Sequence, residues 1–238
     1  MTPLRVRPHL AGILDRTAHV VLTFSVLGNL LPEPEAVARQ VRDMLLETGD
    51  RMSILIGAGD NPFDMLAEAY TAGEDPGRRA EQLVHDAEVD AAGRAPVTPG
   101  TLALLEACRA TGRTVTVYAP HSESAVGRFL HQHGLRSLVG PALGRGFAMR
   151  HPAVRTMAPV LAAIGALPGE TAVVCATFSA MSATQRAGAH AIGVERIREP
   201  RKVLHGGEGS NAVVQSLTHL AEAVRACAPS QQRGASLW

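Results

Sequence analysis

Residues 19–30, with the sequence H-V-V-L-T-F-S-V-L-G-N-L, decide the fold of this 238-residue chain. The first half of the stretch is apolar and rich in β-branched residues, and Gly28 follows it, which is the pattern of a buried strand. Similar short runs recur at 114–118, 171–175 and 190–194, with helical patterns between them. The alternation predicts an α/β protein with a Rossmann-like parallel sheet covered by helices.

The region between the first strand and the rest of the sheet has a helical pattern. Its apolar residues are spaced as in helices over 33–49, 61–71 and 75–93, and a short strand at 52–56 is the only other element expected there. We therefore expect an all-helical cap at 32–95, inserted into an α/β core at 18–31 and 96–227. Residues 1–17 are assigned to an N-terminal extension and 228–238 to a disordered tail.

Composition excludes several classes of protein. Hydrophobic residues make up 46% of the chain, enough for a substantial core, and the net charge is +1 with no long run of one sign. This balance gives no reason to expect nucleic acid or a membrane as a partner. Three scattered cysteines argue against a disulfide framework, and no apolar run is long enough to span a bilayer. We expect a cytoplasmic protein.

Four stretches, in order along the chain, follow predicted strands or begin helices. They are 25–30 (S-V-L-G-N-L), 119–122 (A-P-H-S), 151–152 (H-P) and 175–180 (C-A-T-F-S-A). In order and spacing they resemble the four motifs of the haloacid dehalogenase-like (HAD) superfamily, in particular its phosphatase-like members with a helical cap of the C1 type. The resemblance covers residues 18–226 and implies a HAD-like core with an inserted cap.

The resemblance also implies that the usual chemistry of the family is degenerate here. The nucleophilic aspartate of the family falls on Ser25 and its acid–base aspartate on Leu27. The positions of the second-motif hydroxyl residue, the lysine and the two metal-side aspartates are Ala119, His151, Ala176 and Ala180. Magnesium needs hard oxygen ligands, usually carboxylates, so we expect no metal, no cofactor and no conventional phosphatase or dehalogenase activity.

Ligands of open parallel sheets bind beyond the carboxyl ends of the strands. The polar candidates at these ends and on the cap are Ser25, Asn29, His121, Ser122, His151, Thr177, Ser179, Asp60 and Asn61. Hydroxyls, two histidines and helix amino ends near Ser122 and Ser179 favour a carboxylate, a phosphate or another polar molecule. Asp60 and Asn61 equally suit the start of a helix.

Two functions are open from the sequence. In the first, the protein is a pseudophosphatase that binds a small molecule or a protein partner; in the second, it is an enzyme with metal-independent chemistry, such as proton transfer, cyclisation, elimination or hydrolysis, in a specialised biosynthetic pathway. Ser25 could then be a nucleophile with His121 or His151 as its base, although no third carboxylate to orient the histidine is evident. A purely structural subunit, which would have no pocket, and a homodimer are further alternatives.

Overall fold

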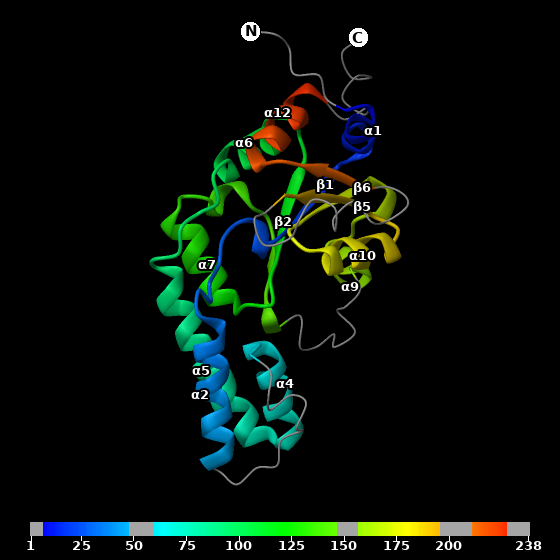
Figure 1. Cartoon of the computed structure of the whole chain (residues 1–238). Coiled ribbons are helices and arrows are strands. Elements are labelled where there is room, and N and C mark those ends of the chain that lie inside the picture. The colour runs from blue at the N-terminus through cyan, green and yellow to red at the C-terminus, as the bar shows by residue number, and fades with distance from the viewer. Residues whose placement is uncertain (1–6, 48–59, 147–156, 196–210, 228–238) are drawn as a thin grey trace.

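The computed structural model describes residues 7–47, 60–146, 157–195 and 211–227. Six strands form one sheet in the order β3-β2-β1-β4-β5-β6, and all neighbouring pairs are parallel (Figure 1). The strands are β1 (His19–Thr23), β2 (Thr114–Tyr118), β3 (Ala142–Leu143), β4 (Thr171–Cys175), β5 (His190–Val194) and β6 (Asn211–Val214). Because β1 lies between β2 and β4 in register, the loops after these three strands leave the sheet side by side.

The side chains of β1 explain why the sheet is covered on both faces. Val20 and Leu22 belong to one apolar cluster, whereas Val21 belongs to another, as expected for a strand whose residues alternate between faces. All three are at most 3% exposed. A strand buried on both faces is a near-continuous apolar run, which is the pattern that this segment has.

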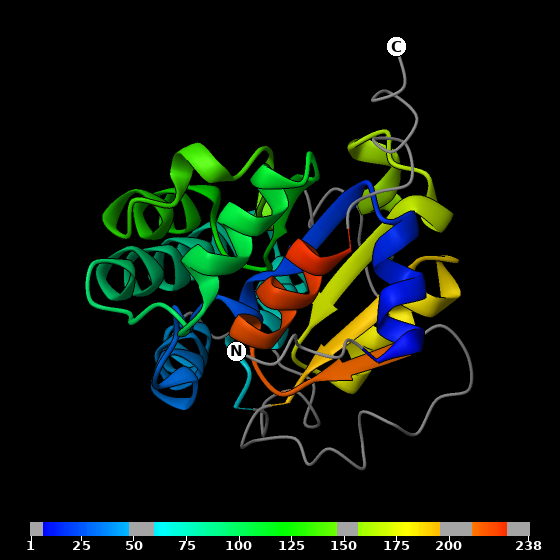
Figure 2. The ribbon, with the colours of Figure 1, turned by 90° about the horizontal axis from the view of Figure 1, so that it is seen from above.

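Helices cover both faces (Figure 2). One face is covered by α1 (Pro8–Arg16), α6 (Thr101–Ala110), α7 (Glu123–Gln132) and α12 (Leu217–Ala226), and the other by α9 (Ala158–Ala163) and α10 (Phe178–Arg186). On the first face Phe129 of α7 and Leu220 of α12 are at most 1% exposed, and on the second face Met181 of α10 is 1% exposed. The helices therefore bury the sheet from both sides.

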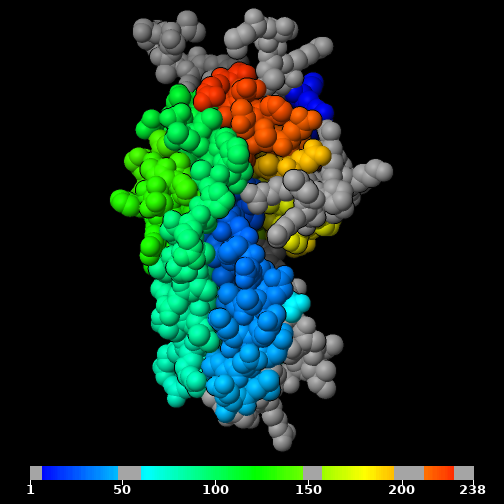
Figure 3. Space-filling model, turned by 60° about the vertical axis from the view of Figure 1, so that its left-hand side comes forward, coloured from blue at the N-terminus to red at the C-terminus, as the bar shows by residue number. Residues whose placement is uncertain are grey.

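Three helices leave the core after β1 and form a separate bundle beyond the strand ends (Figure 1). They are α2 (Pro34–Glu47), α4 (Pro62–Ala72) and α5 (Glu74–Ala92), and α2 and α5 lie side by side (Figure 3). The bundle has its own apolar core, with Val41, Leu45 and Met65 fully buried. Two chain segments, one before α2 and one after α5, connect the bundle to the sheet. They are hydrogen-bonded to each other, because the amide of Thr98 donates to the carbonyl of Leu27 at 2.7 Å.

The predicted fold class, a Rossmann-like parallel sheet with an inserted helical cap, is confirmed. The strands predicted at 114–118, 171–175 and 190–194 have the observed bounds. The first strand is one residue shorter than predicted, because a 3₁₀ turn (Phe24–Val26) follows it. The strand predicted at 52–56 lies outside the described residues. The proposed domain bounds stay a prediction.

Two elements were not predicted. The N-terminal region contains α1, whose residues Ile13 and Leu14 are 1% exposed and belong to the main core. Strand β3 has only two residues at the sheet edge, too few for a periodic pattern. The apolar residues of α1 lie in one short stretch without a helical repeat. The sequence of α1, like that of β3, therefore does not distinguish the segment from a loop.

Candidate functional site

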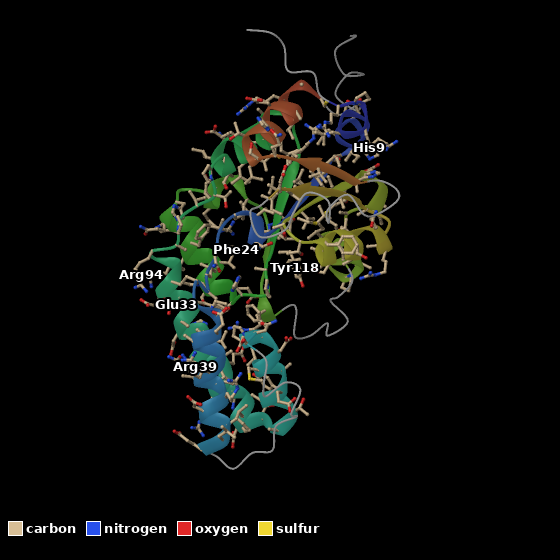
Figure 4. All side chains as sticks on the ribbon, in the orientation of Figure 1. His9, Phe24, Glu33, Arg39, Arg94 and Tyr118 are labelled. Carbon is tan, nitrogen blue, oxygen red and sulfur yellow. The ribbon has the colours of Figure 1, made fainter. Side chains whose placement is uncertain are left out.

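A crevice of about 810 Å³ lies between the carboxyl ends of the central strands and the cap. It is lined by Ser25, Gly28, Asn29, Leu31, Pro34, Asp60, Asn61, Pro62, Phe63, Pro120, His121, Ala176 and Thr177. Phe24 and Tyr118, at the ends of β1 and β2, mark the region where the strands end and the cap begins (Figure 4). This is the position that parallel sheets offer to ligands.

The turn after β1 separates the two positions that the resemblance assigns to the family's aspartates. Ser25 is exposed, lines the crevice, and has its hydroxyl 3.2 Å from that of Thr23. The hydroxyl of Thr23 also donates to the carbonyl of Val174 at 3.1 Å, which ties β1 to β4 at this point. Leu27, in contrast, is fully buried in the apolar core.

The end of β4 supplies the next wall. Ala176 and Thr177 line the crevice, and Thr177 begins α10, its hydroxyl accepting a hydrogen bond from the amide of Ala180 at 3.3 Å. Ser179 and Ala180 line a neighbouring hollow of about 750 Å³, to which Asn61 and Pro120 also contribute. The amino end of α10 therefore lies between the two hollows, with Thr177 rather than Ser179 as its cap.

The loop after β2 brings Pro120 and His121 to the crevice, whereas Ala119 and Ser122 do not line it. The amide of Ala119 donates to the carbonyl of Leu143 at 2.9 Å, which keeps this fully buried residue in the sheet. Ser122 is 9% exposed and begins α7, its hydroxyl accepting from the amide of Ala125 at 3.3 Å. His121 is 8% exposed and is the residue of this loop whose polar side chain lines the crevice.

The cap wall presents two amides and one carboxylate. The Oδ1 atoms of Asn29 and Asn61 accept from the amides of Leu31 and Phe63, each at 3.0 Å, so Asn61 begins α4 as one of the two alternatives expected. Each side chain therefore retains its NH₂ group as a donor. Asp60 is an exposed carboxylate 4.0 Å from Nη2 of Arg42, which balances part of its charge.

A buried carboxylate, Glu88 of α5, connects the cap to the crevice wall and is not among the residues predicted from the sequence. The side chain is fully buried and accepts three hydrogen bonds. The donors are Nδ1 of His121 at 3.0 Å, the amide of Ser122 at 3.0 Å and Nη1 of Arg145 at 2.9 Å. Burial raises the pKa of Glu88, but the hydrogen bond from His121 and the positive charge of Arg145 outweigh burial, so the pKa lies below its ordinary value.

Arg145 reaches Glu88 because the chain after β3 lies very close to the loop of His121. A Cβ atom on Gly144 would be 2.9 Å from the carbonyl oxygen of His121, and the amide of Arg145 donates to that carbonyl at 2.7 Å. The guanidinium of Arg145 is buried and its Nε lies 3.5 Å from Oε1 of Glu81. Glu81 and Glu88 are two helical turns apart on α5, so one arginine contacts both.

A further hydrogen bond extends this cluster into the cap. The hydroxyl of Tyr70 on α4 donates to Oε2 of Glu81 at 2.5 Å. Burial, together with the hydrogen bond to Glu81, raises the pKa of Tyr70 to about 12. A sequence signal for the cluster existed: Glu88 lies on the same helical face as Val84 and Ala91, both buried, where an acidic residue needs a partner.

Two aromatic rings fix the plane of His121. Its ring centroid lies 5.2 Å from that of Phe24 and 5.4 Å from that of Phe63, both in edge-to-face arrangements. Phe24 belongs to the core and Phe63 to the cap, so the histidine lies between the two units. The other histidine expected at the crevice, His151, lies outside the described residues.

Comparison with known proteins identifies the fold. No family model and no curated protein matches the sequence. Solved structures match nearly the whole chain. A HAD hydrolase of family IA, variant 3, from Entamoeba histolytica superposes with a TM-score of 0.62 at 15% identity, covering 88% of this chain and 100% of that one. The chain has the haloacid dehalogenase-like fold.

Two further structures give the same result. CbbY from Rhodobacter sphaeroides, in complex with phosphate, has a TM-score of 0.61 at 12% identity and covers 86% of this chain and 96% of that one. The L-2-haloacid dehalogenase from Xanthobacter autotrophicus, with chloropropionic acid covalently bound, has a TM-score of 0.56 at 16% identity, covering 88% and 98%. At these identities the likeness shows the HAD-like fold, as the four motifs predicted.

The positions that the resemblance assigns to the family's chemistry lie in different environments in this structure. Ser25 and Ala176 line the crevice, Ala180 lines the neighbouring hollow, and Leu27 and Ala119 are fully buried. Of the ligand-binding candidates, Ser25, Asn29, His121, Thr177, Asp60 and Asn61 meet in the crevice. In the described part of the chain, no helix is long and apolar enough to cross a membrane.

Proposed function

We propose that this HAD-fold protein is a pseudophosphatase whose crevice binds a small polar molecule without magnesium-dependent phosphoryl transfer. The observation that carries the proposal is the identity of the side chains at the ends of β1 and β4. Ser25 and Ala176 line the crevice there with a hydroxyl and a methyl group. A protein partner docking at the same face is compatible with this proposal, whereas nothing favours nucleic acid.

The residues present do not fit a magnesium ion, the metal that the fold family implies. Magnesium prefers six oxygen ligands in octahedral geometry, usually with one or more carboxylates. Ser25 supplies one hydroxyl, Ala176 supplies no ligand atom, and Asp60 lies on the cap wall beside Arg42. Among the described residues, no group of three or more histidine, cysteine, aspartate or glutamate side chains could hold a metal ion.

The crevice instead favours a ligand rich in oxygen acceptors. The NH₂ groups of Asn29 and Asn61 are donors, because their oxygens are used by the backbone. The hydroxyls of Ser25 and Thr177 can donate as well, and Thr177 lies at the amino end of α10, where the helix dipole favours negative charge. A carboxylate or phosphate group matches this set of donors.

Titration calorimetry with phosphate and with simple carboxylates, with and without EDTA, tests the proposal. We expect millimolar or tighter binding that EDTA does not change. Ser25→Asp should weaken binding at least tenfold by charge repulsion, whereas Ser137→Asp, which adds the same charge at an exposed residue outside the crevice, should leave it unchanged. The proposal is rejected by binding that EDTA abolishes, or by no binding at millimolar concentration.

The second function, a metal-independent enzyme, is favoured by one observation. His121 in the crevice wall is hydrogen-bonded to a buried carboxylate, which is how many enzymes orient a histidine for proton transfer. Both functions predict that phosphate esters such as p-nitrophenyl phosphate are not hydrolysed with magnesium. Rapid magnesium-dependent release of nitrophenol would contradict both.

A further inference from the structure

We propose that Glu88 is a positioning residue, which holds the His121 proton on Nδ1 and thereby leaves the lone pair of Nε2 to accept a proton from a ligand in the crevice. The inference rests on the crevice being a ligand site and deepens its second function. It assigns the proton-accepting atom, and it assigns the class of ligand: a small molecule with a hydroxyl or another acidic X–H group beside its oxygen acceptors.

The protonation state of Glu88 decides which nitrogen of His121 carries the proton. Three donors surround the carboxyl group, one of them the guanidinium of Arg145, and its pKa lies below the ordinary value, so the group is ionised at neutral pH although it is fully buried. An ionised carboxylate can only accept hydrogen bonds, so the histidine nitrogen that lies 3.0 Å from it must carry a proton. In a neutral imidazole ring the other nitrogen, Nε2, is then the acceptor.

Nε2 is the nitrogen available to a ligand. Among the described residues, no group forms a hydrogen bond with Nε2 of His121. The Nδ1 side of the ring faces the interior, because its partner Glu88 is fully buried, and yet the residue lines the crevice. The ring therefore presents its Nε2 side to the crevice.

The carboxylate itself is held from several directions. The amide of Ser122 occupies Oε2, while Arg145 and His121 share Oε1, so the plane of the carboxylate is fixed. Arg145 is 3% exposed, which keeps water from competing for these bonds. With Phe24 and Phe63 against the imidazole ring, both partners have one orientation, which is the condition for a precise site.

The cluster also stabilises the product of proton acceptance. The lone pair of Nε2 takes a proton from the ligand X–H bond, whose electron pair stays on the ligand as X⁻. The imidazolium cation that forms keeps its Nδ1–H bond to Glu88, and the attraction between the cation and the buried carboxylate strengthens this bond. The same proton then returns from Nε2 to another atom of the ligand or to a leaving group, so the step needs no metal and no co-reactant.

NMR spectroscopy of the ¹⁵N-labelled full chain tests the assignment directly. The ¹⁵N shifts of the imidazole ring distinguish Nδ1–H from Nε2–H, and a His121→Asn variant assigns the signals. At a pH at which the ring is neutral we expect His121 to carry its proton on Nδ1, the opposite of the Nε2–H form that free histidine favours. A wild-type His121 protonated on Nε2 would overturn the inference, and this measurement needs no altered protein to fold.

Two variants on one helix separate positioning from structure. Glu88→Gln removes the carboxylate at His121, and its amide can donate to Nδ1, so the Nε2–H population should rise to the major form. Glu81→Gln removes the other carboxylate that Arg145 contacts, without touching His121, and should leave the ring protonated on Nδ1. An unchanged tautomer in Glu88→Gln, or the same change in both variants, would contradict a positioning role.

The outcomes distinguish this inference from the proposed function. If calorimetry finds no ligand in the crevice while His121 carries its proton on Nδ1, the binding proposal fails and the geometry of Glu88 stands. If phosphate or a carboxylate binds while His121 is protonated on Nε2, the crevice remains a binding site and the proton-accepting role is wrong.

Discussion

Glu88 joins the cap helix α5 to the wall of the crevice through His121, Ser122 and Arg145. It is a fully buried charge with three donors, and breaking such a pair by removing one partner leaves an uncompensated charge behind. Removing one partner can lower the free energy of unfolding strongly even where the intact Glu88–Arg145 pair contributes little to it. Substitutions at this residue therefore affect stability and the crevice together.

The pH dependence of stability follows from the lowered pKa of Glu88. A carboxyl group whose folded pKa lies below its unfolded value, about 4.3 for glutamate, stabilises the fold above that pH, and this contribution is lost as the pH falls through the folded pKa. We expect Glu88→Gln to lower the free energy of unfolding by about 3 kcal/mol at pH 7. The deficit relative to wild type should narrow below about pH 4.3, as urea unfolding at pH 7, 5.5 and 4 would show. A deficit independent of pH would contradict the ionised state.

Ser25 and Ala176 provide a gain-of-function prediction. They line the same crevice at the ends of adjacent strands β1 and β4, so two carboxylates introduced there should lie close together. We expect Ser25→Asp/Ala176→Asp to bind magnesium at millimolar or lower concentration in titration calorimetry. The control Ser25→Asp/Ser137→Asp adds the same charge without the pairing. Equal affinities for magnesium in the two variants would show that Ser25 and Ala176 are not paired positions.

The sequence predicts a crevice residue where that residue directly follows a recognisable strand. Ser25, His121 and Thr177 line the crevice because each follows a strand that the sequence shows clearly. The sequence does not predict the pairing of Glu88 and Arg145, because it joins a cap helix to the segment after β3, 57 residues further along the chain. Contacts between distant segments leave no periodic pattern in a single sequence.

Among the elements, α1 and α12 depend on one buried arginine. Arg113, at the start of β2, is 4% exposed, and its guanidinium donates to the carbonyls of Leu14, Thr17, Val224 and Cys227. Burial lowers the pKa of Arg113. The planar guanidinium has five N–H donors, so one side chain can hydrogen-bond to backbone carbonyls at the ends of both helices. The ends of helices α1 and α12 are therefore joined through one residue that lies between the two helices in the sequence.

Replacing Arg113 should destabilise both helices. Arg113→Met retains the length of the side chain but leaves several buried carbonyls without a donor, so we expect about 3 kcal/mol less free energy of unfolding. Arg109→Met, at an exposed position near the end of α6, is the control and should change stability by less than about 0.5 kcal/mol. Chemical denaturation measures the free energy of unfolding of both variants. Similar decreases in the two variants would contradict the role of Arg113.

The elements show what a single sequence contains. Strands β2, β4 and β5 were predicted with their observed bounds, because each is a short β-branched run between helices. The sequence predicts only an extension where α1 lies, because the helix is buried by packing against α12 and β4 and its own pattern is short. Tertiary contacts, not local pattern, make it an element.

For the whole molecule, the cap and the core are two apolar units joined by a polar contact. Each unit has its own cluster of buried side chains, and the Glu88–Arg145 pair lies between them. Helices α5 and α7 also pack against one another across this boundary. The polar cluster is therefore one of the contacts that hold the cap over the crevice, beside the packing of α5 on α7 and of Phe63 on His121.

Loss of Arg145 should loosen the cap without unfolding the sheet. We expect Arg145→Met to raise amide hydrogen exchange in α2, α4 and α5 at least tenfold while exchange in β1, β2 and β4 changes little. Arg78→Met, which removes an exposed arginine from helix α5 of the cap, makes the same change of side chain and is the control. Uniform acceleration over both units, or equal effects of the two variants, would contradict a specific cap contact.

The most direct measurement is a crystal structure of the protein grown with both phosphate and magnesium chloride. We expect an oxyanion in the crevice within hydrogen-bond distance of Ser25, Thr177 or Asn29, and no metal ion between it and Ala176. An octahedral magnesium ion beside Ser25 and Ala176 would contradict metal-free binding by this HAD fold.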